Sequence, residues 1–327
     1  MNKISRREAI TGILATSASV LSLTGTTAAA GRSETFAQQK TPPLTQAEMT
    51  AIENALGKKG RYVEAESTYT VPLPRNDLKV SIKGEAVPIS FGFGGWVSIK
   101  KTIDGKSAVL MSDTVLLEEE VNPLITAAQA NGLEISAIHN HFFYEQPRIF
   151  YMHLHGMGDV AGLAKSYAAT IKNNKLFPAN QPTVTAPAKT AKEIFDLPAL
   201  DKVVGTTGAV GGATYKYTIG RADQHITAMG AEMTASIGLN SWASFAGSAD
   251  AAHIAGDIAM LESEVNPVIK ALRQNNLEVV ALHHHMLGEN PRIIFLHYYG
   301  RAAAPRLAAG FRAALDVLGE KHDRMKM

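Results

Sequence analysis

The sequence predicts an α+β fold in which one domain occurs twice in tandem. Residues 118–156 and 262–300 are identical at 19 of 39 positions, without a gap and at a constant offset of 144. Within each copy, stretches with the two-residue alternation of strands lie on both sides of a stretch with helical spacing. Helices that alternate with antiparallel strand pairs are typical of α+β proteins. Each copy is therefore expected to form an antiparallel sheet with a His-bearing hairpin, packed by helices.

Composition sets the domain boundaries. The first repeat domain is expected at residues 44–174 and the second at 193–320, and both are long enough to form a core of their own. The stretch 175–192 holds three prolines among Thr, Ala and Asn, which suits an extended linker. Residues 31–43 are expected to form a flexible segment before the first domain.

Local signals predict the elements of the first copy. Thr45 is a candidate N-cap for a short helix that ends near Gly57, and Asp159 can cap a closing helix that runs to about residue 170. Pro123 lies in the middle helix, where it either falls in the first turn or causes a kink. Strands are expected at residues 78–87, 91–100, 107–115, 133–142 and 147–155, and the middle helix is expected at 116–130.

The N-terminus has the layout of an export signal. The pair Arg6-Arg7 precedes a weakly apolar stretch, and Ala28-Ala29-Ala30 satisfies a small-residue cleavage rule. Residues 1–30 therefore look like a twin-arginine signal peptide, with an ordinary secretory signal as the alternative. The expected partner is the twin-arginine translocation machinery, and the expected location is periplasmic or secreted. No later segment has 18 apolar residues in a row, so no stable membrane span is expected.

Charge and cysteine content exclude several classes of protein. The formal net charge is +2, and it falls to zero without the first 30 residues, so the basic surface of a nucleic-acid binder is not expected. The chain contains no cysteine, which excludes disulfides, Cys-ligated zinc, iron–sulfur clusters and thiol catalysis. Any metal site must therefore use histidine, carboxylate or carbonyl ligands.

Eight of the eleven histidines fall in two short windows, residues 139–155 and 283–297. Residues i and i+2 of a strand point to the same face, and a turn near Gln146 would bring a third histidine opposite the first. Three imidazoles per repeat then converge on one face, an arrangement that suits Zn, Cu, Ni or Fe. Packed structural histidines are the alternative. The candidate metal ligands are His139, His141 and His153 in the first copy and His283, His285 and His297 in the second.

Charged residues beside these histidines are candidates for further roles. Glu145 and Glu289 could be fourth ligands or, if the protein is an enzyme, catalytic general bases. Arg148 and Arg292 could bind an anionic substrate, or form ion pairs with the glutamates of the middle helix. The repeated aspartates Asp113 and Asp257 could cap that helix or orient a histidine. Trp96 and Trp242 occupy one repeated position and are expected to pack in the core.

The repeated motifs resemble a known family. In the first copy they read Leu-Glu-x-Glu-Val-Asn-Pro, then Ile-His-Asn-His, then Glu-x-Pro-Arg-Ile-x-x-x-His, and the second copy differs in reading Leu-His-His-His at the middle motif. The resemblance to the LppY/LpqO family of exported bacterial proteins covers about residues 45–320. The resemblance implies export and a duplicated, His-containing domain of unknown function, and it implies no established reaction. Some members look like lipoproteins, whereas this chain has no cysteine for lipid attachment.

Three functional hypotheses follow. In the first, the protein is an exported soluble protein that binds a divalent transition metal at a His-rich site in each repeat. In the second, the protein is a metal-dependent hydrolase in which a glutamate activates a metal-bound water for attack on a small-molecule substrate. In the third, the protein is a metal-free envelope scaffold with structural histidines. His-x-His-x3-Glu also matches half of the cupin motif, but the preceding helix argues against an all-β barrel.

Overall fold

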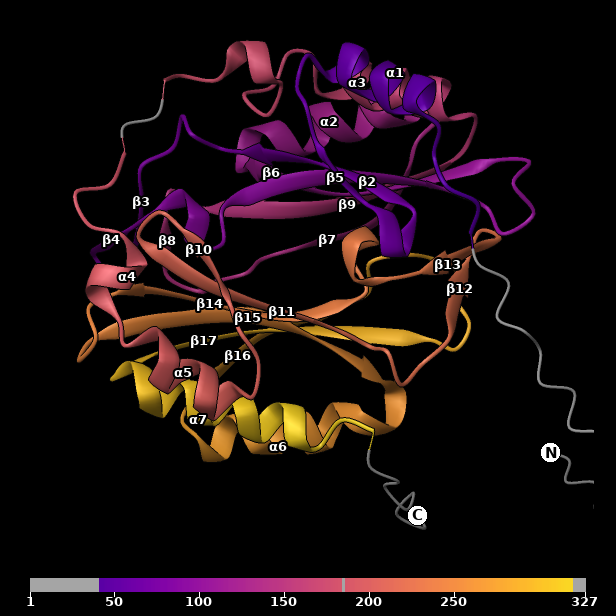
Figure 1. Ribbon diagram of the computed structural model, residues 1–327. Helices are drawn as coiled ribbons and strands as arrows, with labels where there is room; N and C mark the ends of the chain where they lie inside the picture. Colours follow the sequence, from indigo (N-terminus) through magenta and orange to yellow (C-terminus); the bar gives the residue numbers. More distant parts are fainter. Residues whose placement is uncertain (1–40, 184–185, 320–327) are drawn as a thin grey trace, which may run out of the picture. The chain divides into compact units, whose positions relative to one another are not determined.

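Each repeat contributes one six-stranded antiparallel sheet (Figure 1). The computed structural model describes residues 41–183 and 186–319, which belong to one unit by their contacts. The predicted signal peptide at 1–30 and most of the segment at 31–43 lie outside the described residues. In spatial order, the first sheet consists of β1 (Arg61–Val63), β2 (Thr68–Pro74), β5 (Gly94–Lys101), β6 (Ala108–Leu117), β9 (Ile149–Gly158) and β7 (Glu134–His139). The second consists of β10 (Ala209–Gly211), β11 (Thr214–Gly220), β14 (Asn240–Gly247), β15 (Ala252–Leu261), β17 (Ile293–Ala302) and β16 (Glu278–His283).

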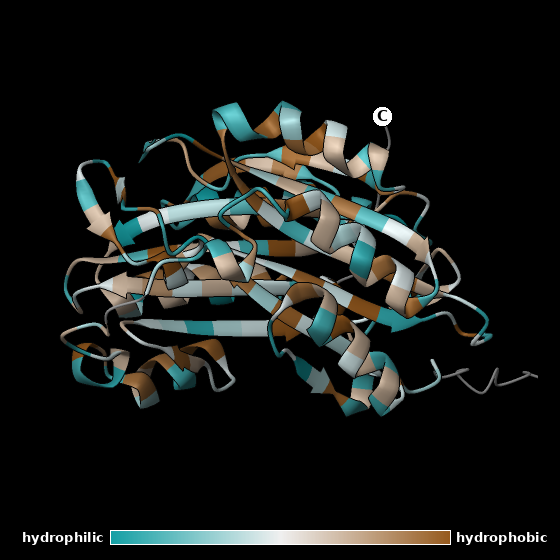
Figure 2. Ribbon diagram, turned by 90° about the horizontal axis from the view of Figure 1, so that it is seen from above, coloured by the Kyte–Doolittle hydropathy of each residue, from teal (hydrophilic) through white to brown (hydrophobic). Residues whose placement is uncertain are grey.

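The two sheets lie face to face, and helices cover the outer face of each (Figure 1). The Tyr167 hydroxyl of one helix lies 3.2 Å from the Thr114 hydroxyl of β6, and Leu307 of another packs near Gly300 of β17. Hydrophobic and hydrophilic residues alternate along the helices, as expected for helices with one buried face (Figure 2). The helices are α1 (Gln46–Leu56), α2 (Glu118–Ala130) and α3 (Val160–Ile171) on the first sheet, and α5 (Leu197–Val204), α6 (Val265–Gln274) and α7 (Ala304–Asp316) on the second.

Several predicted elements are confirmed. The Thr45 side chain accepts a hydrogen bond from the Glu48 backbone at the start of α1, and Gly57 ends that helix with a φ of 64°. Asp159 caps α3 by accepting from the Gly162 backbone N–H. Pro123 lies inside α2 beyond its first turn, and the helix continues through it. The α+β class and the duplication of the sheet-and-helix unit are therefore as expected.

The strand predicted at 78–87 is wrong. The chain there forms a hairpin of β3 (Val80–Ile82) and β4 (Glu85–Val87), and β3 also pairs with β8 (Glu145–Gln146). Lys83 and Gly84 have φ angles of 51° and 83°, which is the backbone of a two-residue hairpin turn. The corresponding hairpin of the second repeat is β12 (Ile226–Ala228) with β13 (Ala231–Met233).

The expected linker at 175–192 contains a short 3-10 turn, Pro178–Asn180, and the first residues of α4 (Ala191–Ile194). No helix in the described ranges is long and apolar enough to cross a membrane. The proposed domain boundaries themselves stay a prediction.

In each repeat, a buried arginine forms hydrogen bonds both to the sheet and to a glutamate at the start of the middle helix. Arg75 donates to the Val115 carbonyl oxygen and to Glu120. Arg221 makes the equivalent bonds to the Ala259 carbonyl oxygen and to Glu264. The predicted ion pairs between the glutamates of this helix and Arg148 or Arg292 are therefore wrong, since Arg75 and Arg221 occupy that position.

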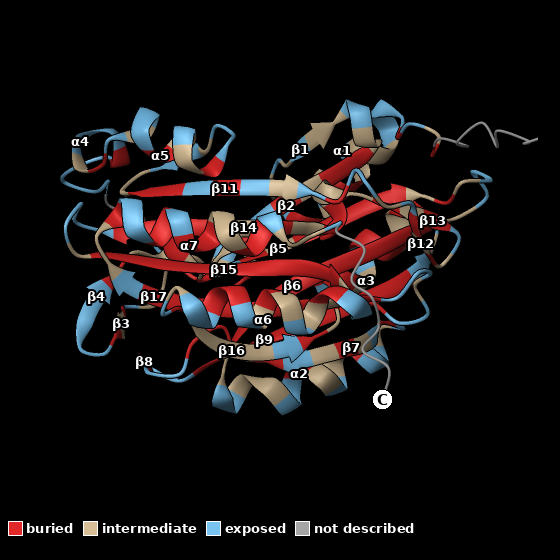
Figure 3. Cartoon of the chain, turned by 90° about the horizontal axis from the view of Figure 1, so that it is seen from below, coloured by how far each residue is buried: buried red, intermediate tan, exposed pale blue. Residues whose placement is uncertain are grey.

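The layer between the sheets holds an unusual number of polar side chains. The central strands β6 and β15 are buried along almost their whole length (Figure 3). Their outward residues pack under the helices, so their alternate residues face the opposite sheet. Part of this inner layer is apolar, with Met111 and Phe295 in one hydrophobic cluster. Directly beside that cluster the layer contains buried aspartates and histidines from both repeats.

Candidate metal centre

The His-x-His pairs lie at the C-terminal ends of strands β7 and β16. Strand β7 ends at His139 and β16 ends at His283, and the second histidine of each pair follows two residues later. Residues two apart in an extended chain share a face, so both rings of a pair point between the sheets. Tyr151 stacks on the ring of His141, and Phe295 stacks on that of His285. These stacked aromatic rings restrict the orientation of the second histidine of each pair.

The third histidine of each repeat comes from the neighbouring strand. His153 of β9 pairs across the sheet with Ala137, and His139 pairs with Tyr151. The expectation that His153 lies directly opposite His139 is therefore wrong by two residues. A two-residue shift preserves the face, so both rings still point into the same layer. The second repeat repeats this register, with His297 opposite Ala281.

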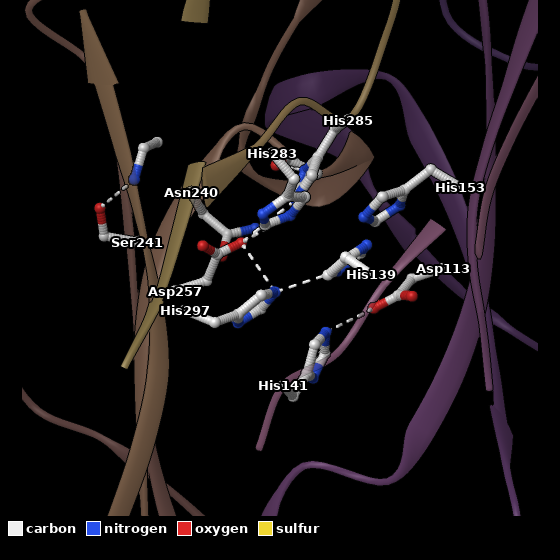
Figure 4. A network of polar contacts seen from close by, with 12 residues as sticks. Asp113, His139, His141, His153, Asn240, Ser241, Asp257, His283, His285 and His297 are labelled. Carbon is white, nitrogen blue, oxygen red and sulfur yellow. Dashed lines mark hydrogen bonds and ion pairs between the residues drawn. The ribbon is translucent and has the colours of Figure 1, made fainter. Parts of the chain in front are cut away.

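All six histidines meet in one cluster between the sheets (Figure 4). The rings of His139 and His283 stack with their centroids 3.8 Å apart. The Nε2 atoms of His139 and His297 are 3.1 Å apart. The two sets of ligands expected, one in each repeat, thus lie together in one cluster to which both repeats contribute.

Two buried aspartates border the cluster. The Asp257 Oδ2 atom lies 3.1 Å from His285 Nε2 and 3.8 Å from His283 Nε2. Its counterpart Asp113 lies 4.0 Å from His141 Nε2. Neither aspartate caps a helix. The N-cap residue of α2 is a leucine, and so is the N-cap residue of the 3-10 helix that precedes α6 in the second repeat. Only Asp257 lies within hydrogen-bond distance of a histidine, so the expected role of these aspartates in orienting a histidine stays a prediction.

Backbone carbonyl groups fix the tautomer of three histidines. The Nδ1 atoms of His153 and His297 each lie 3.0 Å from a carbonyl oxygen, that of Ser112 and of Gly256. The Nδ1 atom of His285 lies 2.9 Å from the Gly238 carbonyl oxygen. A carbonyl oxygen only accepts, so Nδ1 carries the proton and Nε2 keeps its lone pair. Such outer hydrogen bonds are typical of histidines that bind metals through Nε2.

Burial sets the protonation states of the centre. Desolvation lowers the pKa of all six histidines, to about 3 for His285 and about 4 for His297. The imidazoles are therefore neutral at pH 7, which is the form that coordinates metals. Desolvation raises the pKa of Asp113 to about 8 and that of Asp257 to about 6. A bound cation would favour both carboxylates in their charged form.

The donor atoms of the cluster fit a divalent transition metal. Three groups have donor atoms within 4.8 Å of one another, and each of two of them combines histidines of both repeats. Several buried donors make no hydrogen bond within the described part of the chain, namely Asp113 Oδ1, Asp257 Oδ1, His139 Nδ1, His153 Nε2 and both ring nitrogens of His141 and His283. Buried polar atoms normally have a partner, so this concentration points to a ligand. Imidazole with carboxylate suits Zn, Cu, Ni and Fe(II).

The glutamates predicted as fourth ligands belong to none of the three groups. Glu145 Oε1 accepts a hydrogen bond from the Ile149 backbone, and Glu289 does the same for Ile293. These bonds hold the loop after the His-x-His pair against the next strand. Arg148 and Arg292 lie beside the same glutamates, at 3.7 and 3.9 Å, with exposed side chains. Their predicted parts in catalysis and substrate binding remain predictions.

A cleft leads from the surface to the centre. A cavity of about 360 Å³ is lined by Asp113, Asp257, His285 and His297, and a second of about 800 Å³ is lined by Asp113 and His141. Lys216, Trp96 and Trp242 line both cavities. The tryptophans, expected in the core, are thus partly exposed walls of this cleft. Reasoning from the sequence missed Lys216 because its counterpart in the first repeat, at the same place on the sheet, is Thr70.

A family model described as "Domain of Unknown Function (DUF1259)" matches the chain twice, at residues 50–173 and 198–317. The chain belongs to this family. Each DUF1259 repeat spans one sheet with its helices, and the histidines of both repeats build the cluster. None of the curated proteins matches the chain. Among solved structures, a trimeric bacterial microcompartment shell protein, PduB, matches over 79% of this chain and 89% of its own at 13% identity. The TM-score of 0.18 is too low to support an argument about fold or function.

Proposed function

We propose that this DUF1259 protein binds divalent transition-metal ions in one centre shared by its two repeats. The observation that carries the proposal is the convergence of six neutral, buried imidazoles whose free nitrogens face one another. Two nitrogens bound to one tetrahedral ion at 2.0–2.1 Å stand about 3.4 Å apart. The 3.1 Å between His139 Nε2 and His297 Nε2 is close to that spacing.

The duplication supports a pair of ligand sets. The first ligand set is Asp113, His139, His141 and His297, and the second is Asp257, His283, His285 and His153. An offset of 144 relates the two sets, with the third histidine exchanged between the repeats. The rings of His141 and His297 lie 3.7 Å apart, and those of His285 and His153 lie 4.2 Å apart. Each set takes its aspartate and His-x-His pair from one repeat and its last histidine from the other.

Metal content tests the proposal directly. Protein stripped with EDTA, reloaded with Zn²⁺ or Co²⁺ and dialysed should retain metal, and the Co²⁺ form should show the intense visible bands of a tetrahedral site. The double variant His139→Ala/His283→Ala removes the stacked pair at the middle of the cluster and should lose the metal. His225→Ala, an exposed histidine outside the cluster, is the matched control. Metal-free wild-type protein after reloading would overturn the proposal.

A metal-dependent hydrolase is the second candidate, and the cleft supports it. A catalytic metal keeps an open coordination position, whereas a structural one is closed by four protein ligands. Asp257, His285 and His297 line an open cavity, so a small molecule can reach them. Zn²⁺-dependent hydrolysis of 4-nitrophenyl acetate or 4-nitrophenyl phosphate, lost in His297→Ala, would support this function. Absence of turnover with fully loaded protein would favour a binding role.

We also propose export through the twin-arginine route to the periplasm or outside the cell, as the Arg6-Arg7 pair and the LppY/LpqO resemblance suggest. The test replaces both arginines with lysine and follows the location of the protein in a host with that route. Retention in the cytoplasm would support the proposal. Unchanged export would indicate an ordinary secretory signal.

A further inference from the structure

Lys216 lines both cavities beside the candidate centre, together with Trp96, Asp113 and Trp242. His285 lines one of these cavities and His141 lines the other, one histidine from each ligand set. A small molecule in either cavity therefore lies close to Lys216.

The ammonium group of Lys216 forms no hydrogen bond and no close ion pair within residues 41–183 and 186–319, although Asp113 and Asp257 of the same cavity attract it electrostatically. Its Nζ atom lies over the Trp242 ring, 4.2 Å from the ring centroid. No carboxylate lies within ion-pair distance of it, so its three N–H donors are free to bind an anion. Arg61 lines the same cavity and also forms no ion pair with the described residues.

The position equivalent to Lys216 in the first repeat holds a residue without charge, Thr70. Lys216 pairs across the sheet with Ser244, just as Thr70 pairs with Ser98. The Thr70 hydroxyl lies 2.7 Å from that of Ser98 and donates to the Ser236 carbonyl oxygen, so it serves the contact between the repeats. Lys216 takes the same place without such bonds and leaves its charge in the cleft.

Two tryptophans form apolar walls for the same space. A Cβ atom at Gly238 would lie 3.0 Å from the Trp96 ring, and one at Gly92 would lie 3.8 Å from the Trp242 ring. Each indole therefore lies along a glycine of the other repeat, close to the mouth of the cleft. An apolar wall beside a free cation suits a ligand with a ring and an acidic group.

We propose that the cleft between Trp96 and Trp242 binds a small organic anion with an aromatic body, whose acidic group pairs with Lys216 at the edge of the metal centre. The inference rests on the proposed metal-binding function and names the substrate class of that site. A cavity of about 360 Å³ has room for a single-ring molecule. Bound metal ions would add positive charge beside Lys216 and strengthen the preference for an anion.

The chain provides its own reporter, because it contains two tryptophans and both line the cleft. Benzoate and phenyl phosphate are titrated into Zn²⁺-loaded protein, with quenching of tryptophan fluorescence and isothermal calorimetry as readouts. Benzyl alcohol has the same ring without the charge. We expect saturable binding of at least one anion and binding of the alcohol at least about tenfold weaker. The two anions show whether the site prefers a carboxylate or a phosphoryl group.

Lys216→Gln removes the charge and should weaken anion binding by about tenfold or more while leaving metal content unchanged. Lys106→Gln, an exposed lysine in a turn away from the cleft, is the matched control. Equal affinity of wild-type protein and Lys216→Gln, or equal affinity for the anions and the alcohol, would overturn the inference. Protein that binds the anions through Lys216 but takes up no metal would overturn the proposed metal centre and leave the anion site standing.

Discussion

The Nε2 atoms of His139 and His297 lie 3.1 Å apart, although the two residues are 158 positions apart in the chain and belong to different repeats. Both rings are buried, and burial keeps both neutral. A neutral pair can share one hydrogen bond, or both nitrogens can coordinate one ion. The free donors around them favour coordination. This contact makes the second repeat part of the first repeat's site.

Exchange of ligands between repeats gives a sharp prediction for metal stoichiometry. Wild-type protein should hold two equivalents of Zn²⁺. His141→Ala/His297→Ala removes two ligands of the first ligand set and should retain one equivalent. His141→Ala/His153→Ala removes one ligand from each set and should lose both. Elemental analysis after dialysis measures all three. If each repeat held its own ion, the two double variants would give the opposite results, and a single equivalent in wild-type protein would contradict the pair of sets.

Part of this site is readable from the sequence. The His-x-His spacing places His139 and His141 on one face because strand residues alternate, and the 144-residue offset shows that the arrangement occurs twice. The spacing inside one copy carries no information on how two copies pack. The contact between His139 and His297 is therefore visible only in the folded structure, as is the role of Glu145, whose carboxylate accepts a hydrogen bond from the backbone and does not join the cluster.

Other differences have local physical causes. Apolar alternation continues across residues 78–87, so it concealed the turn at Lys83 and Gly84. The tryptophans were expected in the core because large apolar residues usually pack there, whereas both lie at a cavity. Helix caps were predicted correctly because Thr45 and Asp159 bond to backbone groups only three residues away.

The buried arginines should contribute unequally to stability. Arg221 pairs with Glu264, whose side chain is 1% exposed, whereas Arg75 pairs with Glu120, which is 22% exposed. Arg221→Met leaves a buried carboxylate without a cation and should lower the free energy of unfolding by about 3–5 kcal/mol. Arg75→Met should cost less, because water can solvate Glu120. Urea unfolding of EDTA-treated protein measures both changes. Equal losses, or a larger loss for Arg75→Met, would contradict this assignment.

Arg221 should also make the free energy of unfolding depend on pH in the acidic range. Hydrogen bonds from Arg221 lower the pKa of Asp223 from 3.8 to about 2 in the folded protein. A folded-state pKa below the unfolded one stabilises the protein above about pH 4, and that contribution is lost as the pH falls towards 2. Stability measured by urea unfolding at pH 6, 4 and 3 should therefore fall more steeply in wild-type protein than in Arg221→Met. Parallel slopes would show that Asp223 contributes nothing to acid sensitivity.

One cross-strand position of the sheet holds different residue pairs in the two repeats. Gly256 and Tyr298 face each other across β15 and β17, where the first repeat has Ser112 and Leu154. A Cβ atom at Gly256 would lie 2.3 Å from the Tyr298 hydroxyl, which donates to the Trp242 carbonyl oxygen. Gly256→Ser should therefore be strongly destabilising by overpacking, by about 1–3 kcal/mol or more.

Adding Tyr298→Leu to Gly256→Ser recreates the pair of the first repeat and should recover part of the loss, because it removes the clashing hydroxyl. The recovery should be incomplete, since the Trp242 carbonyl oxygen also lies within 2.0 Å of the new Cβ position. Thermal unfolding of the wild type, both single variants and the double variant completes the cycle. Losses that simply add would contradict the direct contact, because coupling is expected only between touching residues.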